Sequence, residues 1–400
     1  MSDSSSLPRI RLKPKADARA LRHGAPWVYA DDLVTDRRTK ALAPGSVAIL
    51  EDAERTPLGL AAVSPGSKII ARMLDRDLEA RIDRDWFTAR LGAALRLREQ
   101  LYTTPYYRLV HAEGDGLPGL IIDRFGDTCV LQPNAAWLES RLEDLTAALQ
   151  AVTGVRHILK SASGRTRKLE GLDDVSLPLL GTPPDRVEVP MNGAIYIADL
   201  AAGQKTGLFY DQRPNHAFAA KMGRGGRVLD VFSHVGGFGL AALAAGAETA
   251  LAVDGSAAAL ELAAEGAAAM GVADRFETRK SDAFAALEAL NAEGALFDLV
   301  VCDPPAFAPS KPALQQGLRA YERVARLAAP LVAPGGALML CSCSHAAELP
   351  KFRSSCLRGI GRAGRSAQIL YTGGAGPDHP LHAQLGETGY LKAILVRLLP

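Results

Sequence analysis

Residues 227–239 read R-V-L-D-V-F-S-H-V-G-G-F-G, and the architecture predicted for this 400-residue chain starts from them. Val228 and Leu229 belong to a short apolar run that is typical of a buried strand, and Asp230 stands at the carboxyl end of that strand. A glycine-rich loop follows and leads into an Ala- and Leu-rich segment, residues 240–245, that favours a helix. Strand, glycine loop and helix N-terminus together form a cradle for a nucleotide-like ligand at the carboxyl edge of a parallel sheet.

The loop does not read G-x-G-x-x-G, so a dinucleotide site fits poorly, and a tight structural turn is the alternative for the loop taken alone. The later strands favour the ligand site. The apolar run 251–253 ends in Asp254, at about the spacing at which an acidic residue meets the hydroxyl pair of a ribose. Asp282 follows one β-α unit later, and the apolar run 297–302 ends at Asp303. Strands that end in polar residues, with Ala-rich segments between them, predict a doubly wound α/β domain.

This order of strand ends resembles that of class I S-adenosylmethionine (SAM) methyltransferases, whose fold is Rossmann-like. The resemblance implies that SAM is the cofactor. It also implies that Asp230 and the loop after it hold the methionine end, that Asp254 binds the ribose and that Asp282 binds the adenine amine. The cofactor contacts implied within the loop are Ser233, Gly236, Gly237 and Phe238.

The composition is that of a folded protein of two or three domains, with 48% hydrophobic and 22% charged residues and a net charge of +2. The sequence has no run of eighteen apolar residues, so no membrane span is expected. No secretory signal is visible at the N-terminus, and the cytoplasm is therefore the expected location. The five cysteines lack C-x-x-C spacing, and no metal site is expected. Near-neutral charge argues against non-specific binding of polyanions but does not exclude a local basic patch.

Residues 1–75 carry such a patch on a segment of short strands, expected around 45–50, 58–63 and 68–72. The pattern predicts a small β-rich barrel and resembles a PUA domain, an RNA-binding module, most clearly in R-H-G-A-P-W-V-Y at 22–29. A solvated basic face with a core Trp is the alternative. The RNA-binding residues predicted here are Arg9, Arg11, Lys13, Arg22 and Trp27.

Residues 76–189 predict an α+β central domain, and residues 190–400 form the predicted methyltransferase domain. The elements expected in the central domain are helices at 83–102 and 138–152, strands at 155–159 and 186–189, and a charged strand-loop at 165–170.

Several separated motifs together resemble the PUA-containing family of large-subunit rRNA cytosine-C5 methyltransferases (the RlmI type). They are D-L-A-A-G-Q-K-T-G-L-F-Y-D-Q-R at 199–213, D-P-P-A-F at 303–307, C-S-C-S at 341–344, D-H-P at 378–380 and E-T-G-Y-L-K at 387–392. The resemblance spans nearly the whole chain and implies 23S rRNA as the partner; it leaves the oligomeric state open, a homodimer included. The further cofactor contacts that it implies are Gln204, Thr206, Asp211, Arg213 and Asp303.

C5 of cytosine is a poor nucleophile, so its methylation requires a temporary bond between a thiolate and C6. Cys343, at the Ser-Cys-Ser position of the family motif, is the predicted nucleophile, and Asp303 is the predicted partner of N3 or N4. Cys341 lies two residues away on the same face of the expected strand and stays an alternative nucleophile, although packing is favoured for it. Related two-cysteine enzymes carry a second thiol after the proline of the Asp-Pro motif. Pro305 or Ala306 stands there, so the acceptor of the C5 proton is left open.

Two other functions fit parts of the pattern. An RNA guanine methyltransferase shares the Asp-Pro-Pro-x-Phe loop and needs no thiol, so Cys343 discriminates against it. A non-catalytic RNA-binding or ribosome-assembly protein would retain the fold alone, and the intact acidic strand ends argue against that function.

Overall fold

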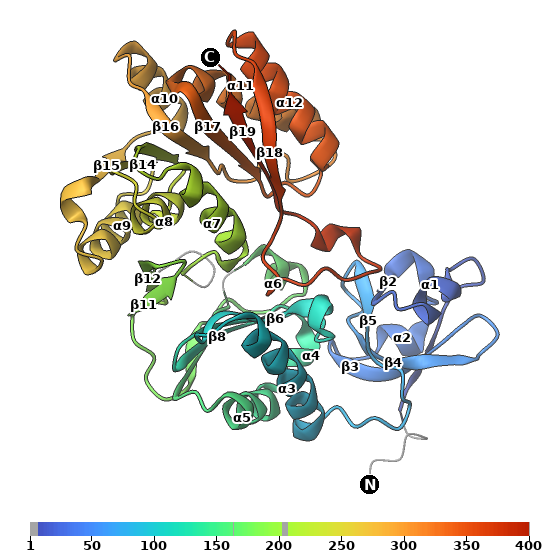
Figure 1. Cartoon of the computed structure of the whole chain (residues 1–400). Helices are drawn as coiled ribbons and strands as arrows, with labels where there is room; N and C mark the ends of the chain where they lie inside the picture. Colours follow the sequence, from blue (N-terminus) through green and yellow to red (C-terminus); the bar gives the residue numbers. More distant parts are fainter. Residues whose placement is uncertain (1–6, 163, 202–206, 400) are drawn as a thin grey trace. The chain divides into compact units, whose positions relative to one another are not determined.

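The computed structural model describes residues 7–162, 164–201 and 207–399 (Figure 1). The chain divides into two compact units. Unit 1 comprises Met1–Pro184 and Pro377–Thr388, and unit 2 comprises Asp185–Gly376 and Gly389–Pro400. Unit 2 contains the predicted cradle for the cofactor.

The first sheet of unit 1 follows the order β1-β3-β4-β5-β2 and confirms the β-rich N-terminal segment. Its strands are β1 (Arg9–Arg11), β2 (Trp27–Tyr29), β3 (Ser46–Glu51), β4 (Pro57–Val63) and β5 (Ile69–Asp75), with the short helices α1 (Ala18–Arg22) and α2 (Arg37–Lys40). Alternate apolar side chains of these strands, such as Leu50, Ala61 and Ile70, are at most 1% exposed and form the core of the segment.

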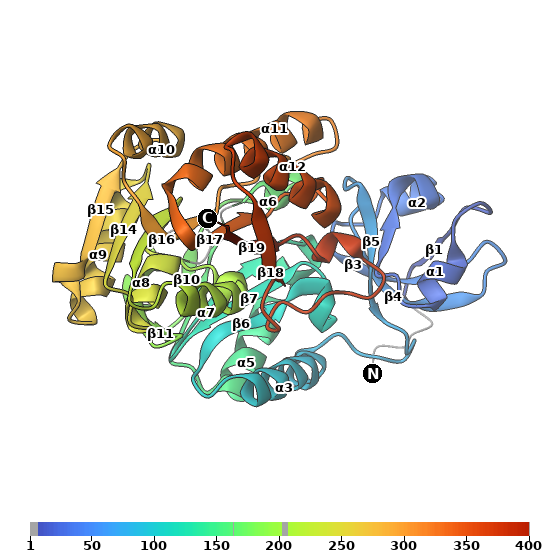
Figure 2. The same ribbon diagram turned by 45° about the horizontal axis from the view of Figure 1, so that its top comes forward.

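The second sheet of unit 1 has the order β10-β9-β8-β7-β6. Its strands are β6 (Tyr106–His111), β7 (Leu120–Phe125), β8 (Thr128–Pro133), β9 (His157–Lys160) and β10 (Leu177–Leu180), and its helices are α3 (Arg84–Leu101), α4 (Ala136–Glu139), α5 (Leu142–Thr153) and α6 (Arg165–Leu169). The helices α3 and α5 lie side by side against this sheet (Figure 2). The helix expected at 83–102 is thus confirmed as α3.

One expectation for this region was confirmed only in part, over Leu142–Thr153, and another was wrong. The single helix expected at 138–152 is two helices, because the side chains of Ser140 and Arg141 both donate to the carbonyl of Trp137 and end α4 there. The charged strand-loop expected at 165–170 is the helix α6. The side chain of Arg167 in this helix is 1% exposed and pairs with Glu139 and Asp173. The charge of Arg167 therefore belongs to a buried ion-pair cluster and not to a solvated loop.

The motif D-H-P at 378–380 lies in the segment of unit 1 that comes from the C-terminal part of the chain. Asp378 is fully buried, and its carboxylate accepts from the backbone N–H of Arg108, while Arg98 donates to its carbonyl. His379 bonds the same carboxylate and packs against the ring of His111, and burial lowers the pKa of His111 to about 2. The motif therefore has a structural role, since each buried polar group in it is paired.

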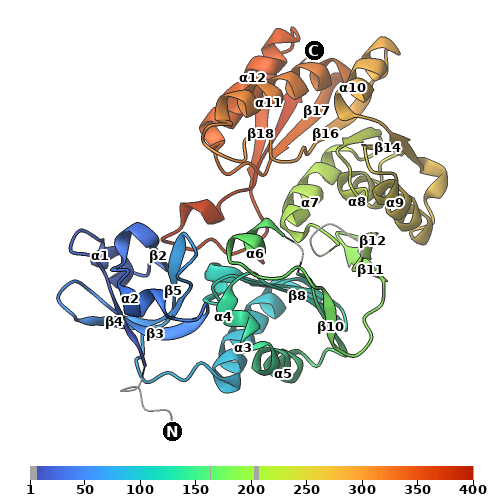
Figure 3. The same cartoon turned by 180° about the vertical axis from the view of Figure 1, so that it is seen from behind.

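Unit 2 contains a mixed sheet in the order β15-β14-β13-β16-β17-β19-β18, parallel except for β19, which runs antiparallel to both of its neighbours. Its strands are β13 (Arg227–Val231), β14 (Thr249–Asp254), β15 (Phe276–Lys280), β16 (Phe297–Cys302), β17 (Val332–Ser342), β18 (Ala367–Gly373) and β19 (Lys392–Leu398). The helices are α7 (Arg213–Met222), α8 (Gly237–Ala244), α9 (Ala257–Ala269), α10 (Ala283–Ala292), α11 (Leu314–Ala328) and α12 (Leu349–Arg362). Helices α7, α8 and α9 cover one face and α10, α11 and α12 the other (Figures 1 and 3), which confirms the doubly wound domain.

A hairpin of β11 (Arg186–Met191) and β12 (Ala194–Asp199) precedes this sheet and packs against α9 (Figure 3). The order of the large sheet reverses between β13 and β16, and ligands of open α/β sheets bind in the crevice beyond the carboxyl ends at such a point.

Two boundaries in unit 2 differ from expectation. α8 begins at Gly237, three residues before the expected start, because Gly236 adopts a left-handed conformation with φ of +79° and caps the helix. β17 begins at Val332 and includes Pro334, which was expected to precede the strand; the register with β16 is irregular there, so the ladder loses no bond to the proline.

Candidate active site

A cavity of about 540 Å³ opens at the carboxyl ends of β13, β14 and β16 and at the turn after β17. That volume suits a small-molecule ligand. The predicted site residues that line it are Asp211, Ser233, Gly237, Phe238, Asp254, Asp282, Asp303 and Cys343. Asp230, Gly236 and Arg213 are not among its lining residues, and Gln204 and Thr206 lie outside the described residues.

The loop after β13 brings backbone, rather than side chains, against the cavity. A Cβ added at Gly237 would lie 2.8 Å from Nε2 of His216, so only glycine fits there. Phe232 and His234 have positive φ angles of +63° and +50°, a costly conformation for residues with a side chain. Such strain persists where the surrounding structure enforces it and is concentrated at ligand sites.

Asp230 shapes this loop from behind. Its side chain is fully buried, and one carboxylate oxygen accepts from the N–H groups of Phe238 and Gly239 at 3.1 and 2.8 Å, in the first turn of α8. Burial raises the pKa of Asp230 to about 7, because the two hydrogen bonds do not fully offset the loss of hydration. Asp230 therefore fixes the conformation of the loop, and its contact with the cofactor stays a prediction.

Asp230→Asn is expected to increase the stability of the SAM-depleted protein at about pH 8 by roughly 1–4 kcal/mol. The carboxyl group keeps its proton up to about pH 7 when folded, against an ordinary value of 3.8, so the free energy of unfolding of the wild type falls as pH rises between these values. Urea unfolding at about pH 5 and about pH 8 measures the effect. The exposed Asp274→Asn is the control, and an equal pH dependence in wild type and Asp230→Asn would contradict the prediction.

Two further carboxylates stand at neighbouring strand ends. Asp254 ends β14 and accepts from the N–H groups of His234 and Ser256 at 2.9 and 2.8 Å. Asp282 caps α10, where one oxygen accepts from the N–H groups of the first helical turn. Each carboxylate oxygen has a further lone pair, so both groups can accept hydrogen bonds from a ligand in the cavity. The residues present thus fit SAM, while the ribose contact of Asp254 and the adenine contact of Asp282 stay predictions.

Asp303, directly after β16, is oriented by a chain of side chains. The amide of Gln212 donates to its carboxylate at 2.8 Å, Asn215 donates to the Gln212 oxygen at 2.6 Å, and the hydroxyl of Tyr371 donates to Asn215 at 3.0 Å. Gln212 lies within the motif at 199–213 but is not among the site residues that the sequence predicts. A role that consists of orienting another side chain leaves no signal in residue type or spacing.

Cys343 follows the last residue of β17, in a turn that is fixed from both sides. The hydroxyls of Ser342 and Ser344, both fully buried, bond the hydroxyl of Tyr321 at 2.8 and 2.7 Å. Ser344 Oγ also accepts from the N–H of Ala308 at 2.9 Å, which joins this turn to the loop after β16. Cys343 is half-buried and lines the cavity, as Asp303 does. A thiol and a carboxyl group are therefore held against one cavity.

Cys341 has a different environment. It is 1% exposed within β17, opposite Ala393 of β19, and does not line the cavity. Burial raises the pKa of its thiol well above the ordinary value.

The predicted RNA contacts in β1, β2 and α1 lie in unit 1. The side chains of Arg9 and Arg22 are about half exposed and pair with Glu51 and Asp52. Lys13 is exposed, Arg11 is half-buried, and the indole N–H of Trp27 donates to Glu113 at 2.8 Å. An ion pair with a partly exposed arginine leaves further N–H donors available for phosphate.

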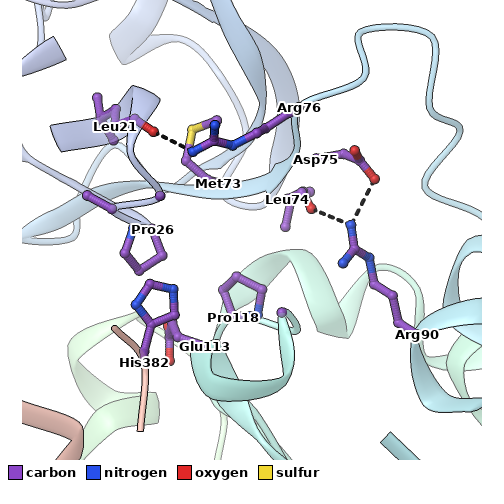
Figure 4. Close-up of a pocket in the computed structure, with 13 residues that line it drawn as sticks. Leu21, Pro26, Met73, Leu74, Asp75, Arg76, Arg90, Glu113, Pro118 and His382 are labelled. Carbon is purple, nitrogen blue, oxygen red and sulfur yellow. Dashed lines mark hydrogen bonds and ion pairs between the residues drawn. The ribbon is translucent and has the colours of Figure 1, made fainter. Parts of the chain in front are cut away.

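A second cavity, of about 330 Å³, lies next to these elements (Figure 4). Its two arginines are engaged by the protein: Arg76 donates to the carbonyl of Leu21, and Arg90 donates to the carbonyl of Leu74 and the carboxylate of Asp75. In the described part of the chain no helix could cross a membrane, and no group of three His, Cys, Asp or Glu side chains could hold a metal ion.

Comparison with known proteins agrees with this geometry. The family model of S-adenosylmethionine-dependent methyltransferases matches residues 127–378, and that of PUA-like domains matches residues 10–76. The chain is thus a SAM-dependent methyltransferase with a PUA-like domain. It is 36% identical to the ribosomal RNA large subunit methyltransferase I of Aeromonas hydrophila, across 98% of this chain and 99% of the relative. A ribosomal RNA large subunit methyltransferase of Deinococcus radiodurans is 33% identical, across 99% of each chain. The chain therefore belongs to the family of ribosomal RNA large subunit methyltransferase I.

Solved structures give the same fold over the whole length. A protein from Streptococcus mutans, described as a SAM-dependent methyltransferase, aligns with a TM-score of 0.82 at 19% identity, across 98% of this chain and all of that one. A methyltransferase complexed with SAH aligns with a TM-score of 0.83 at 20% identity, across 98% and 100% of the two chains.

Proposed function

We propose that this protein transfers a methyl group from SAM to C5 of a cytosine in 23S rRNA through a bond between Cys343 and C6. One observation carries the proposal: a half-buried thiol and a carboxyl group, Cys343 and Asp303, line the same cavity as the loop that fits the cofactor. The relatives are named as methyltransferases of the large-subunit ribosomal RNA. RNA as substrate accords with the PUA-like domain.

In this mechanism the Cys343 thiolate attacks C6, and the new Sγ–C6 bond shifts electron density to N3 and C5. Asp303, in its carboxylic acid form once the base is bound, donates a proton or a hydrogen bond to N3 and stabilises that density, with Gln212 fixing the carboxyl orientation. SAM supplies the electrophilic methyl group that C5 accepts. Transfer of the C5 proton to solvent water then breaks the Sγ–C6 bond and returns Cys343 as a thiolate, while a proton given to N3 returns to Asp303.

The surroundings of the two cysteines favour Cys343 as the nucleophile. A nucleophilic thiol must reach the base and ionise near neutral pH. Cys343 faces the cavity, whereas Cys341 is sealed within β17 with a raised pKa. The target base must also leave its stack to enter such a cavity, so single-stranded or easily unstacked RNA is the expected form of the substrate.

The test is a covalent trap. RNA with 5-fluorocytidine at the target position cannot lose the substituent at C5, so the adduct is expected to persist and to map to Cys343 by peptide mass analysis. Bisulfite mapping of 23S rRNA from cells that lack the protein locates the base. An adduct on Cys341 would show that Cys341, and not Cys343, is the nucleophile. Full methyl transfer by the variant with both cysteines replaced by serine would refute the thiol mechanism and favour the guanine methyltransferase.

We also propose that the N-terminal residues bind RNA phosphates. The double variant Arg11→Ala, Lys13→Ala is expected to weaken RNA binding severalfold, with affinity for SAM unchanged. The salt dependence of binding should become shallower, by about one unit in the log–log slope for each lost contact. Deletion of residues 1–75 is a poorer test, because Ala62 and Leu74 belong to the core of the second sheet. An unchanged salt slope would remove the RNA role assigned to these residues.

A further inference from the structure

Lys392, in the motif E-T-G-Y-L-K, has no role in the function proposed so far. It is the first residue of β19 and lies opposite Ser342, the last residue of β17. Its side chain is largely buried, and the residue is 7% exposed. Lysine is almost never buried without a partner, because removing an ammonium group from water costs free energy. A lysine at this position therefore calls for an explanation.

The ammonium group is held beside the nucleophile. Nζ donates to the carbonyl of Ser344 at 2.6 Å and to the carbonyl of Tyr390 at 2.7 Å. Among the described residues no carboxylate forms an ion pair with it. Burial lowers the pKa of Lys392 to about 8, and the negative charge of an ionised Cys343 opposes that change. A cation whose hydrogen bonds go to neutral carbonyls keeps its charge available for a neighbouring thiolate.

We propose that Lys392 holds Cys343 as a thiolate, with its ammonium group fixed next to the nucleophile by the carbonyls of Ser344 and Tyr390. The inference rests on the proposed function for its meaning in catalysis, but the electrostatic effect itself needs no RNA. A neighbouring Lys, Arg or protonated His is a known means of stabilising a thiolate. The same charge assists both ends of the reaction, because Cys343 attacks C6 as a thiolate and leaves as one. Lys392 thus acts through Cys343 and is a positioning residue.

The other ionisable groups around this corner are Asp303 and Asp211 on the cavity wall, Tyr321 beneath the turn, Tyr390, whose hydroxyl donates to Asp211, and His345, whose ring packs on Tyr390. The carboxylates disfavour a thiolate at Cys343, since like charges repel. Burial raises the pKa of Tyr321, so this phenol stays neutral near neutral pH. Lys392 therefore opposes the two acidic side chains.

The thiol can be titrated without any substrate. The four other cysteines, Cys129, Cys302, Cys341 and Cys356, are at most 1% exposed, so iodoacetamide reports on Cys343 in the folded protein. Alkylation proceeds only from the thiolate, and its rate plotted against pH gives the midpoint of ionisation. Lys392→Met is expected to raise that midpoint by about one unit or more, which lowers the rate near neutral pH about tenfold.

Two further variants separate charge from packing. Lys221→Met removes a lysine at the end of α7, which precedes β13 and so lies at the opposite edge of the sheet; its midpoint should equal that of the wild type. Lys392→Arg keeps the charge and should restore most of the shift. An unchanged midpoint in Lys392→Met, or an equal rise in Lys392→Met and Lys392→Arg, would overturn the proposal. If Lys392→Met does not fold, the proposal is still overturned when the ionisation midpoint of Cys343 in Lys392→Arg lies more than about one pH unit above that of the wild type.

The two proposals fail separately. If the ionisation midpoint of Cys343 does not rise in Lys392→Met, while the wild type forms the fluorocytidine adduct on Cys343, the role of Lys392 is refuted and the proposed function stays intact. A shift of the expected size with no adduct on any cysteine would confirm the electrostatic pair and refute cytosine as the substrate.

Discussion

Cys343→Ser is expected to lower the rate of methyl transfer to RNA by about a thousandfold or more. A serine hydroxyl does not ionise near neutral pH, so the bond to C6 does not form, and C5 stays unreactive. SAM affinity should stay within about twofold of the wild type, because the cofactor loop and its carboxylates come from β13, β14 and α10 and not from the turn after β17. Single-turnover methylation and calorimetry measure the two quantities.

Cys341→Ser is the matched control, since it makes the same change two residues away. Its side chain is buried in β17 and forms a hydrogen bond with Gln212 that a serine hydroxyl can keep, so the variant should retain most of the activity, with a loss of stability of at most about 1–2 kcal/mol from burying a more polar group. Loss of SAM binding in Cys343→Ser would mean that the turn is structural. Loss of activity in Cys341→Ser with full activity in Cys343→Ser would assign the chemistry to the other thiol.

The features of unit 2 that could be predicted are those set by local pattern and chain order. The central strands β13, β14 and β16 are largely apolar runs, and acidic residues such as Asp254 and Asp303 stand at the end of a strand or directly after it. Such ends meet at one edge, so the position of the cavity follows from the sequence. The start of α8 did not follow: Gly236 caps the helix, and the buried carboxylate of Asp230 binds the N–H groups of its first turn, a tertiary contact that local pattern does not mark.

Side-chain roles that depend on packing also could not be predicted from the sequence. Asp230 was expected to hold the methionine end together with the loop after it, and this stays a prediction; what the sequence did not indicate is that its buried carboxylate binds the first turn of α8. The left-handed conformations of Phe232 and His234 are enforced by the fold, whereas sequence patterns mark such positions only when glycine or asparagine occupies them. Gln212 and Lys392 lie within motifs, but the partners that explain them, Asp303 and Ser344, are 91 and 48 residues away in the chain. Motif resemblance locates segments, and only the structure distinguishes the residues within them.

Asp303→Ala is expected to lower kcat for methyl transfer by about 10²–10⁴, the usual contribution of a positioned acid or base. The loss arises because the density that builds up on N3 after attack at C6 has no partner in the variant. SAM affinity separates the two roles that the motif implied for Asp303. A catalytic role predicts a change of less than about threefold, whereas a contact with the cofactor predicts a weakening of about tenfold or more. Rapid-quench kinetics and calorimetry on the same preparations decide between them.

The support of Asp303 by Gln212 gives a second, sharper measurement. Gln212→Met removes the hydrogen bond of 2.8 Å to the carboxylate and keeps the length of the side chain, so kcat should fall by about tenfold while the fold is retained. The effect exists only through Asp303, so the double variant Asp303→Ala, Gln212→Met should be no slower than Asp303→Ala alone. Additive losses would show that Gln212 acts on the substrate or on Cys341 independently, and the orienting role assigned to it would be wrong.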